Sequence, residues 1–217
     1  MRLSGVIFDL DGTIADTFAI CFATFRSALA HVGGPYLTDA EIQARFGPSE
    51  DGMLERVVPA QSEEAFTAYV SEYERHLPLC STFPGIAETL GWLRDHGVPI
   101  ALVTGKSRPT ALMSLKAFGL DGVFDPIETG SPSGVVKTVA IRRVVTGWRV
   151  PSHQVIYVGD AVGDVQAAHE AAVLAVAAAW SPTAVADELH ALDPHAIFTD
   201  VAAFRAWLQT TRLGGAA

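Results

Sequence analysis

The chain has 217 residues, of which 49% are hydrophobic and 18% are charged, a composition typical of a globular protein that buries an apolar core. Its formal net charge at pH 7 is -9, and no cluster of lysines and arginines is present in the sequence, so we expect no nucleic-acid partner. The longest apolar run, 171–180, is about half of the ~20 residues that a membrane-spanning helix needs, and the first residues lack a signal-peptide pattern. We therefore expect a cytoplasmic protein with no membrane partner; the oligomeric state is left open.

Short apolar runs predict the strands of a parallel sheet. Runs of this kind occur at residues 3–8, 100–103 and 155–158, with further candidates at 174–178 and 196–198. Because they are apolar throughout rather than alternating, they predict strands covered on both faces by helices. The helices are predicted at 85–95, 110–118, 135–145, 164–172 and 202–208. This pattern predicts a doubly wound α/β fold, in which sites form beyond the carboxyl ends of the strands.

Residues 16–82 interrupt this alternation, because they show helical periodicity and no convincing strand. Apolar residues at i, i+3, i+4 and i+7 spacing predict a first helix from Phe18 to Val32. Thr38 and Glu41 form a capping box that predicts a second helix, and a third is predicted from about residue 62 to 77. We predict a Rossmann-like core of residues 1–15 and 83–217 with an inserted helical cap of residues 16–82. The last residues, LGGAA, predict a frayed tail.

Four carboxylates lie at or just after the ends of two predicted strands: Asp9, Asp11, Asp160 and Asp164. Bringing such like charges together out of water is costly without a cation, so the pattern indicates a metal site. Ligands that are all oxygen atoms favour a hard ion, and a site with few carboxylates that also handles phosphate would favour Mg²⁺ over Ca²⁺. The alternative is that these aspartates cap helices, a role that Asp164 could fill. Cys21 and Cys80 show no metal-binding spacing and are expected to be small buried residues.

The motifs of the chain resemble those of the haloacid dehalogenase-like hydrolase superfamily, and they follow in the family's order. They are VIFDLDGTIADT at 6–17, ALVTGKS at 101–107, Lys137, and VGDAVGD at 158–164. Lys137 is the weakest match, because Thr138 follows it where the family often has proline. The helical insert resembles the α-helical cap of the phosphoglycolate phosphatase and β-phosphoglucomutase branch.

The resemblance implies a Mg²⁺-dependent phosphatase acting on a small phosphorylated metabolite. Asp9 would be the nucleophile that forms an aspartyl-phosphate, and Asp11 would be the general acid and then the general base. Thr104 would hold the transferring oxygens, and Lys137 would offset their negative charge.

The resemblance also implies the remaining ligands. The metal would be bound by Asp160, by the carboxylate of Asp9 and by the carbonyl of Asp11, while Asp164 would act through water or by orienting Lys137. The backbone around Gly105 and Lys106 would contact the phosphate, and Gly12 would shape the turn after the first strand.

Several related activities fit less well. The string Gly105-Lys106-Ser107 is no nucleotide-binding P-loop, because position 100 is isoleucine. A dehalogenase would lack Asp11, and a phosphonate-cleaving relative would need a cap lysine, which residues 16–82 do not contain. Two alternatives to the phosphatase stay open: a sugar phosphomutase of the β-phosphoglucomutase type, and a non-catalytic phospho-binding protein.

The cap loop 45–54, RFGPSEDGML, is where we expect the leaving group of the substrate to be recognised. Arg45, Ser49 and Glu50 are the candidate residues. Glu50 stands about where mutases carry an arginine, and it would suit an amine or hydroxyl group rather than a second phosphate. The alternative is that the loop is only a solvated turn between helices.

Overall fold

The central sheet has six parallel strands in the order β4-β3-β2-β5-β6-β7. The computed structural model describes residues 2–134 and 136–213. The strands are β2 (Gly5–Phe8), β3 (Ile100–Val103), β4 (Ile127–Glu128), β5 (Val155–Gly159), β6 (Leu174–Ala178) and β7 (Ala196–Phe198). The predicted α/β fold with a doubly wound parallel sheet is confirmed.

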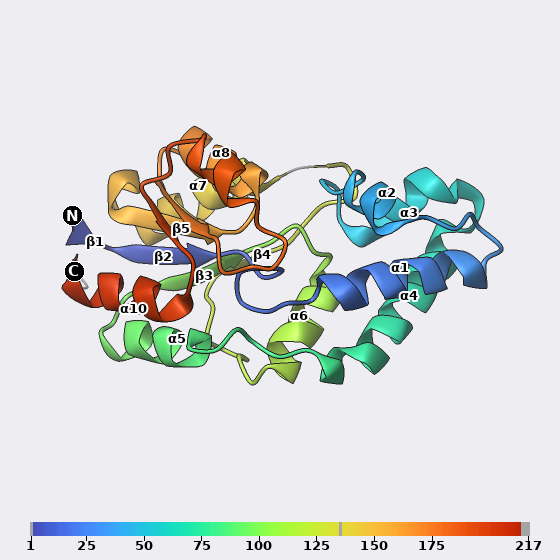
Figure 1. Cartoon of the computed structure of the whole chain (residues 1–217), viewed down its shortest axis with the longest axis horizontal. Coiled ribbons are helices and arrows are strands. Elements are labelled where there is room, and N and C mark those ends of the chain that lie inside the picture. Colours follow the sequence, from blue (N-terminus) through green and yellow to red (C-terminus); the bar gives the residue numbers. More distant parts are fainter. Residues whose placement is uncertain (1, 135, 214–217) are drawn as a thin grey trace.

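Helices cover both faces of this sheet (Figure 1). On one face, α5 (Ile86–Asp95) and α10 (Val201–Thr210) pack against Val6 and Phe8 of β2. On the other face, α7 (Lys137–Trp148) and α8 (Val162–Glu170) pack against Ile7. Successive side chains of a strand point to opposite faces, so an all-apolar strand can serve both layers. Each fully buried side chain of this size contributes about 1.5–3 kcal/mol.

The remaining helices of the core, α6 (Arg108–Ala117) and α9 (Ala186–His190), complete these layers. The helices predicted in the core begin and end within about three residues of those observed, and only α9 was not expected. The predicted start at Val135 lies outside the described residues; α7 begins at Lys137.

The first predicted strand, 3–8, is divided in two. β1 (Arg2–Leu3) pairs with β8 (Arg212–Leu213) in a separate two-stranded sheet, whereas β2 pairs with β3 and β5. Ser4 lies between them and donates its backbone N–H to the carbonyl of Gln154 at 2.7 Å. Leu213, expected in a frayed tail, therefore belongs to a strand; the rest of that predicted tail, 214–217, lies outside the described residues.

Residues 18–79 form helices that lie beyond the end of the sheet to which β2 leads (Figure 1). They are α1 (Phe18–His31), α2 (Asp39–Gln43), α3 (Glu50–Val57) and α4 (Ser62–His76), with short 3-10 turns at Pro59–Gln61 and Leu77–Leu79. The capping box of Thr38 and Glu41 is present at the start of α2. These helices share an apolar cluster of their own. The boundaries of the core and the cap stay a prediction.

The expectation of a loop over 45–54 is wrong in its second half, because α3 begins at Glu50. Gly52 lies inside this helix, where its lack of a side chain is required: a Cβ there would come 2.3 Å from the carbonyl oxygen of Pro132. The glycine therefore allows close packing of α3 on the 131–134 segment rather than marking a turn.

No helix in the described part of the chain is both long and apolar enough to cross a membrane.

Candidate active site

Three of the predicted metal ligands come together at the carboxyl end of the sheet. Phe8 and Val158 are partners in the register of β2 and β5, so Asp9 and Asp160, which lie just beyond them, emerge side by side. Asp164 lies in the first turn of α8, three residues after its N-cap. One oxygen from each of Asp9, Asp160 and Asp164 lies within 4.8 Å of the others, and all three side chains are buried. These residues are called the acidic cluster below.

Burial raises the pKa of two members of the acidic cluster. The pKa of Asp160 is raised to about 8 by burial, with further increases from the charges of Asp164 and Asp9. The pKa of Asp9 is raised to about 6, because the effect of burial exceeds the opposing effect of Lys137. Two carboxyl groups that resist ionisation next to each other indicate a site that lacks positive charge.

Lys137, the first residue of α7, lies between two carboxylates of the acidic cluster. Its Nζ donates to Asp9 Oδ2 at 2.6 Å and also contacts Asp164 Oδ1. Burial lowers the pKa of Lys137, but the charges of Asp164 and Asp9 outweigh burial and raise it well above its usual value. Lys137 is therefore charged, and it stands where a transferring phosphate on Asp9 would need a positive neighbour.

The acidic cluster fits a divalent cation. Its donors are buried carboxylate oxygens, which suit a hard cation, and one lysine shared by Asp9 and Asp164 leaves the charge of the three carboxylates incompletely balanced. The side chain of Asp11 is turned elsewhere: it accepts a hydrogen bond from Thr17 and lies 3.3 Å from Lys106 Nζ. Its predicted part in metal binding, through the carbonyl, stays a prediction.

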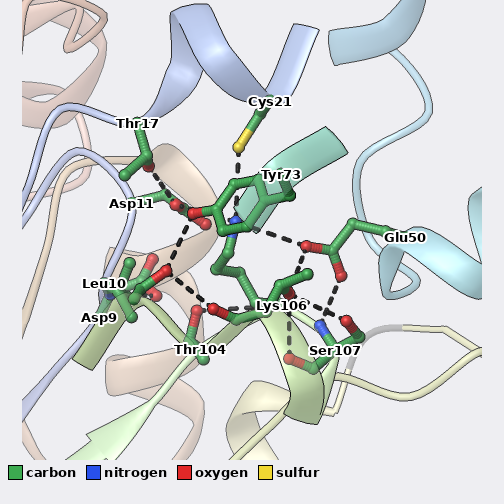
Figure 2. A network of polar contacts seen from close by, with 12 residues as sticks. Asp9, Leu10, Asp11, Thr17, Cys21, Glu50, Tyr73, Thr104, Lys106 and Ser107 are labelled. Atoms are coloured by element: carbon green, nitrogen blue, oxygen red, sulfur yellow. Dashed lines mark hydrogen bonds and ion pairs between the residues drawn. The ribbon is translucent and has the colours of Figure 1, made fainter. Parts of the chain in front are cut away.

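Lys106, in the loop after β3, lies at the centre of a second polar network (Figure 2). Its buried Nζ lies 3.3 Å from Asp11 Oδ1, 3.4 Å from Glu50 Oε1 and 3.4 Å from Cys21 Sγ. The ammonium also lies 4.3 Å from the centre of the Tyr73 ring. The network therefore ties the strand end of the core to α1, α3 and α4.

Glu50 lies in this network with both carboxylate oxygens occupied. Oε2 accepts the backbone N–H of Ser107 at 2.5 Å, and Oε1 accepts the hydroxyl of Thr110 at 2.9 Å. Burial raises the pKa of Glu50, but Lys106 and the bond from Ser107 outweigh burial and lower it. Glu50 is a charged residue held by the protein itself, turned toward α6 and the loop before it rather than offered to a ligand.

The other two predicted cap residues have their polar partners outside the acidic cluster. Arg45 donates to the carbonyl of Glu41 in the preceding helix. Ser49 is buried, donates its hydroxyl to Asp51 and its backbone N–H to the carbonyl of Ser131. Neither lines the cavity described below, so their predicted roles in substrate binding gain no support.

The predicted phosphate-binding residues Thr104 and Gly12 follow β3 and β2, the neighbouring strands that end at the site. Thr104 is buried at the end of β3, where its hydroxyl accepts the backbone N–H of Lys106 at 3.3 Å. Gly12 has a φ of 73°, and a Cβ there would come 2.0 Å from Asp160 Oδ2. Glycine at position 12 therefore allows the turn after β2 to pass directly beside a carboxylate of the acidic cluster.

A cavity of about 350 Å³ joins these parts. Its core side is lined by Asp9, Asp11, Thr104, Gly105, Lys106, Gly130, Val136, Lys137, Asp160, Ala161, Gly163 and Asp164. Its cap side is lined by Phe18, Cys21, Phe25, Ile42, Phe46, Gly47, Pro48, Glu50, Met53 and Tyr69. The acidic cluster and the cap helices thus face one shared cavity, which is large enough for a small molecule.

Some polar residues around the site were not anticipated. Thr17 donates its hydroxyl to the carboxylate of Asp11. Both residues belong to the first motif, 6–17, so the sequence did carry a signal for this contact. The hydroxyl of Tyr157 lies 3.2 Å from Asp164 Oδ1 and 3.0 Å from the carbonyl of Val103. Thr183 Oγ1 lies 3.2 Å from Asp160 Oδ2. Tyr157 is part of an apolar strand, and Thr183 lies 23 positions after Asp160 in the sequence. The residues next to them therefore give no indication of either contact.

The chain is similar in sequence to several known proteins. The chain is 33% identical over 180 residues to the tyrosine-protein kinase PtkA of Mycobacterium tuberculosis, but it spans 62% of that protein's length. It is 27% identical over 186 residues to the pyrophosphatase PpaX of Bacillus pumilus, covering 82% of this chain and 84% of the relative. It is 28% identical over 218 residues to the phosphoglycolate phosphatase of Pseudomonas savastanoi pv. phaseolicola, covering 90% of this chain and 80% of the relative.

Solved structures show the same fold. A predicted phosphoglycolate phosphatase from Haemophilus somnus superposes with a TM-score of 0.81 at 22% identity, over 96% of this chain and 99% of that one. A haloacid dehalogenase-like family hydrolase from Streptococcus pneumoniae superposes with a TM-score of 0.76 at 25% identity, over 95% of this chain and 99% of that one. The family profile described as haloacid dehalogenase-like hydrolase matches residues 6–178. Because that match covers most of the chain, including the acidic cluster and both lysines of the site, the protein belongs to the haloacid dehalogenase-like hydrolase family.

Proposed function

We propose that the protein is a Mg²⁺-dependent phosphatase that hydrolyses a small phosphorylated metabolite through an aspartyl-phosphate on Asp9. The observation that carries the proposal is the position of Asp9, whose carboxylate contacts Lys137 at 2.6 Å and belongs to the acidic cluster. Membership of a hydrolase family and the phosphatases among its relatives support the same reaction.

The first displacement uses Asp9 and Asp11. A carboxylate oxygen of Asp9 attacks the phosphorus atom, and the bond from phosphorus to the leaving oxygen breaks as the acid form of Asp11 gives that oxygen its proton. Both residues line the cavity, and both come from the same turn after β2. Dividing one very slow hydrolysis into two displacements lowers the barrier to each.

The second displacement releases phosphate. Water attacks the phosphorus atom of the aspartyl-phosphate, Asp11 takes a proton from that water, and the bond from phosphorus to Asp9 breaks. Lys137 and the backbone N–H groups around Gly105 would stabilise the charge on the transferring oxygens, with Thr104 beside them.

Asp9, Asp160 and Asp164 would hold the magnesium ion, together with the carbonyl of Asp11. The ion would offset negative charge on the phosphate and on the acidic cluster. The structure supports a divalent cation through the buried carboxylates, and the choice of magnesium follows from the preference for oxygen ligands beside a phosphate. The cytoplasmic location predicted from the sequence stays a prediction.

Two of the relatives are phosphatases by name, a pyrophosphatase and a phosphoglycolate phosphatase, and they support phosphate hydrolysis rather than one particular substrate. The mutase alternative gains no support from the cavity, because no arginine is present among the described residues that line it to hold a second phosphate.

The test is release of inorganic phosphate from p-nitrophenyl phosphate with Mg²⁺ and with EDTA. We expect turnover with Mg²⁺ only, and acid-stable labelling of the wild-type protein but not of Asp9→Asn by a ³²P-labelled substrate. Binding of phosphate esters without turnover of any of them would favour the non-catalytic alternative. Turnover that needs priming by a sugar bisphosphate would favour the mutase.

A further inference from the structure

The cap side of the cavity is apolar and rich in rings. Its larger side chains are Phe18, Phe25, Ile42, Phe46, Met53 and Tyr69. They come from α1, α2, α3, α4 and the segment between α2 and α3, so apolar side chains cover most of the cap side, where Glu50, already paired with Lys106, is the charged residue among the described lining residues. A phosphate bound at Asp9 would therefore have its leaving group facing hydrophobic side chains.

Phe46 is the most informative of these residues. It lines the cavity, yet its exposed fraction is 44%, which is high for a large apolar side chain. Its ring stacks on Phe18 and Phe22, with centres 6.2 Å and 6.1 Å apart. The stacking places the Phe46 ring against Phe18 and Phe22 beside the cavity, where a bound ring could cover part of its exposed surface.

The charged side chains that line the cavity disfavour binding of an anionic leaving group. Two lysines line it, and each is already shared by two carboxylates: Lys137 by Asp9 and Asp164, and Lys106 by Asp11 and Glu50. No arginine or histidine is found among the lining residues that the structure describes. A carboxylate or a second phosphate on the leaving group would lose its hydration without meeting an uncommitted positive charge.

We propose that the preferred substrates are phosphate monoesters of uncharged alcohols that carry an aromatic ring or a comparably bulky apolar group, and that esters with an anionic leaving group are disfavoured. This inference rests on the proposed phosphatase activity. The volume of the cavity, about 350 Å³, is within the usual range for sites that bind small organic molecules.

The test compares benzyl phosphate with 2-phosphoglycolate and inorganic pyrophosphate. Benzyl phosphate and 2-phosphoglycolate both release a primary alcohol, so the comparison is not dominated by leaving-group reactivity as it would be with an aryl phosphate. We expect kcat/KM for benzyl phosphate to exceed that for 2-phosphoglycolate about tenfold or more, equivalent to one well-formed apolar interaction together with the cost of an unpaired anion. Equal or better turnover of 2-phosphoglycolate or pyrophosphate would overturn the proposal.

Phe46→Ala tests whether the ring of Phe46 contacts the leaving group of the substrate. The ratio of kcat/KM for benzyl phosphate to that for ethyl phosphate should fall about fivefold, the value of one aromatic contact. Tyr36→Ala is the matched control, since Tyr36 is an aromatic residue of the segment between α1 and α2 that is 77% exposed and does not line the cavity. The control should keep the wild-type ratio, and a Phe46→Ala protein with that same ratio would contradict the inference.

The two proposals fail in different ways. If no ester releases phosphate with Mg²⁺ and Asp9 is never labelled, the phosphatase proposal is wrong. If acetyl phosphate and ethyl phosphate are hydrolysed with Mg²⁺ but benzyl phosphate shows no advantage over 2-phosphoglycolate, the phosphatase proposal holds and the substrate class proposed for it is wrong.

Discussion

Lys106, in the loop after β3, and Glu50, the first residue of α3, form a buried ion pair, with Nζ 3.4 Å from Oε1 and side-chain exposures of 3% and 10%. The pair joins segments 56 positions apart, and Lys106 extends it to Asp11, the residue predicted to be the general acid. Helix α3 is therefore held against the sheet end of the molecule by charge as well as by packing. Such a pair is costly to break from one side, because the remaining charge is left buried.

The first prediction concerns this ion pair. Glu50→Ala should lower the free energy of unfolding by about 3–5 kcal/mol, because Lys106 loses a carboxylate and the N–H of Ser107 loses its acceptor. Glu50→Gln should cost less, since an amide oxygen can still accept that N–H. Urea unfolding at pH 7 measures both, and a double-mutant cycle with Lys106→Met isolates the pair. Additivity within about 0.5 kcal/mol would show that the two side chains are not coupled.

The same pair predicts a pH dependence. The pKa of Glu50 is lowered in the folded protein, so its ionisation contributes stability above the ordinary value of 4.5, and this contribution is lost as the pH falls through the lower folded value. The difference in unfolding free energy between wild type and Glu50→Gln should therefore be full at pH 7 and should shrink in acid below pH 4.5. A difference that stays constant from pH 7 to pH 3 would contradict the assigned ion pair.

The second prediction uses two glycines with nearly the same backbone. Gly12 has a φ of 73° and Gly33 a φ of 69°, but a Cβ at position 12 would meet Asp160 at 2.0 Å, whereas a Cβ at position 33 would meet nothing within 4 Å. Both alanine variants should lose about 1–2 kcal/mol of stability from the left-handed backbone. Gly12→Ala should in addition weaken Mg²⁺ binding and lower kcat/KM by at least about tenfold, because it displaces a carboxylate of the acidic cluster.

Mg²⁺ titration and phosphate release, measured on both variants, separate the two effects. Equal metal affinity in Gly12→Ala and Gly33→Ala would mean that Asp160 is not needed where the structure places it.

The third prediction concerns Lys137. Lys137→Met removes the ammonium that Asp9 and Asp164 share, so two buried carboxylates lose their partner. Without metal, the variant should be less stable by about 3–5 kcal/mol, and saturating Mg²⁺ should restore part of that loss by supplying positive charge. Turnover should fall by about 10² or more even with Mg²⁺, because the phosphate loses a positive neighbour.

Lys116→Met is the control, since Lys116 is an exposed residue of α6. Thermal and urea unfolding with EDTA and with Mg²⁺ give the comparison. A Lys137→Met protein that matches Lys116→Met in both conditions would rule out the role assigned to Lys137.

The sequence predicted the elements that depend on local patterns. The all-apolar runs at β3, β6 and β7 correspond to strands with the same bounds, and the capping box of Thr38 and Glu41 marked the start of α2. The two-residue strands β1, β4 and β8 could not be anticipated, because so short a segment is defined by its partner rather than by its own residues.

The start of α3 was obscured by Gly47, Pro48 and Gly52, which are turn signals in isolation. Gly52 lies inside a helix, and a side chain there is excluded by the backbone of Pro132, a contact 80 positions away. The motifs placed Asp9, Asp160 and Asp164 at or just after the ends of two strands, and these strands prove to be neighbours in the sheet. The motifs did not predict how the side chains are oriented. Nothing local predicts that Glu50 is turned toward Ser107 and Thr110.

The last prediction concerns protons at the acidic cluster. In the metal-free protein the pKa of Asp160 is about 8, raised by burial and by the charges of Asp164 and Asp9, so Asp160 carries a proton at pH 7. A bound Mg²⁺ requires the ionised carboxylate, so binding at pH 7 should release close to one proton, and the apparent affinity should rise with pH from about 6 to 8 and level off above. Calorimetry of Mg²⁺ binding in Tris and in PIPES, which differ in ionisation enthalpy, counts the released protons.

The sign of the stability change follows from the same pKa. Because the folded pKa of Asp160 lies above its ordinary value of 3.8, the folded state holds the proton more tightly, and the metal-free protein should lose stability as the pH rises from about 4 to 8. Mg²⁺ should remove this loss, and Asp160→Asn should reduce it without metal, because an amide has no proton to release in this range. Metal binding without proton release at pH 7, together with the same slope in Asp160→Asn, would show that Asp160 is already ionised in the free protein.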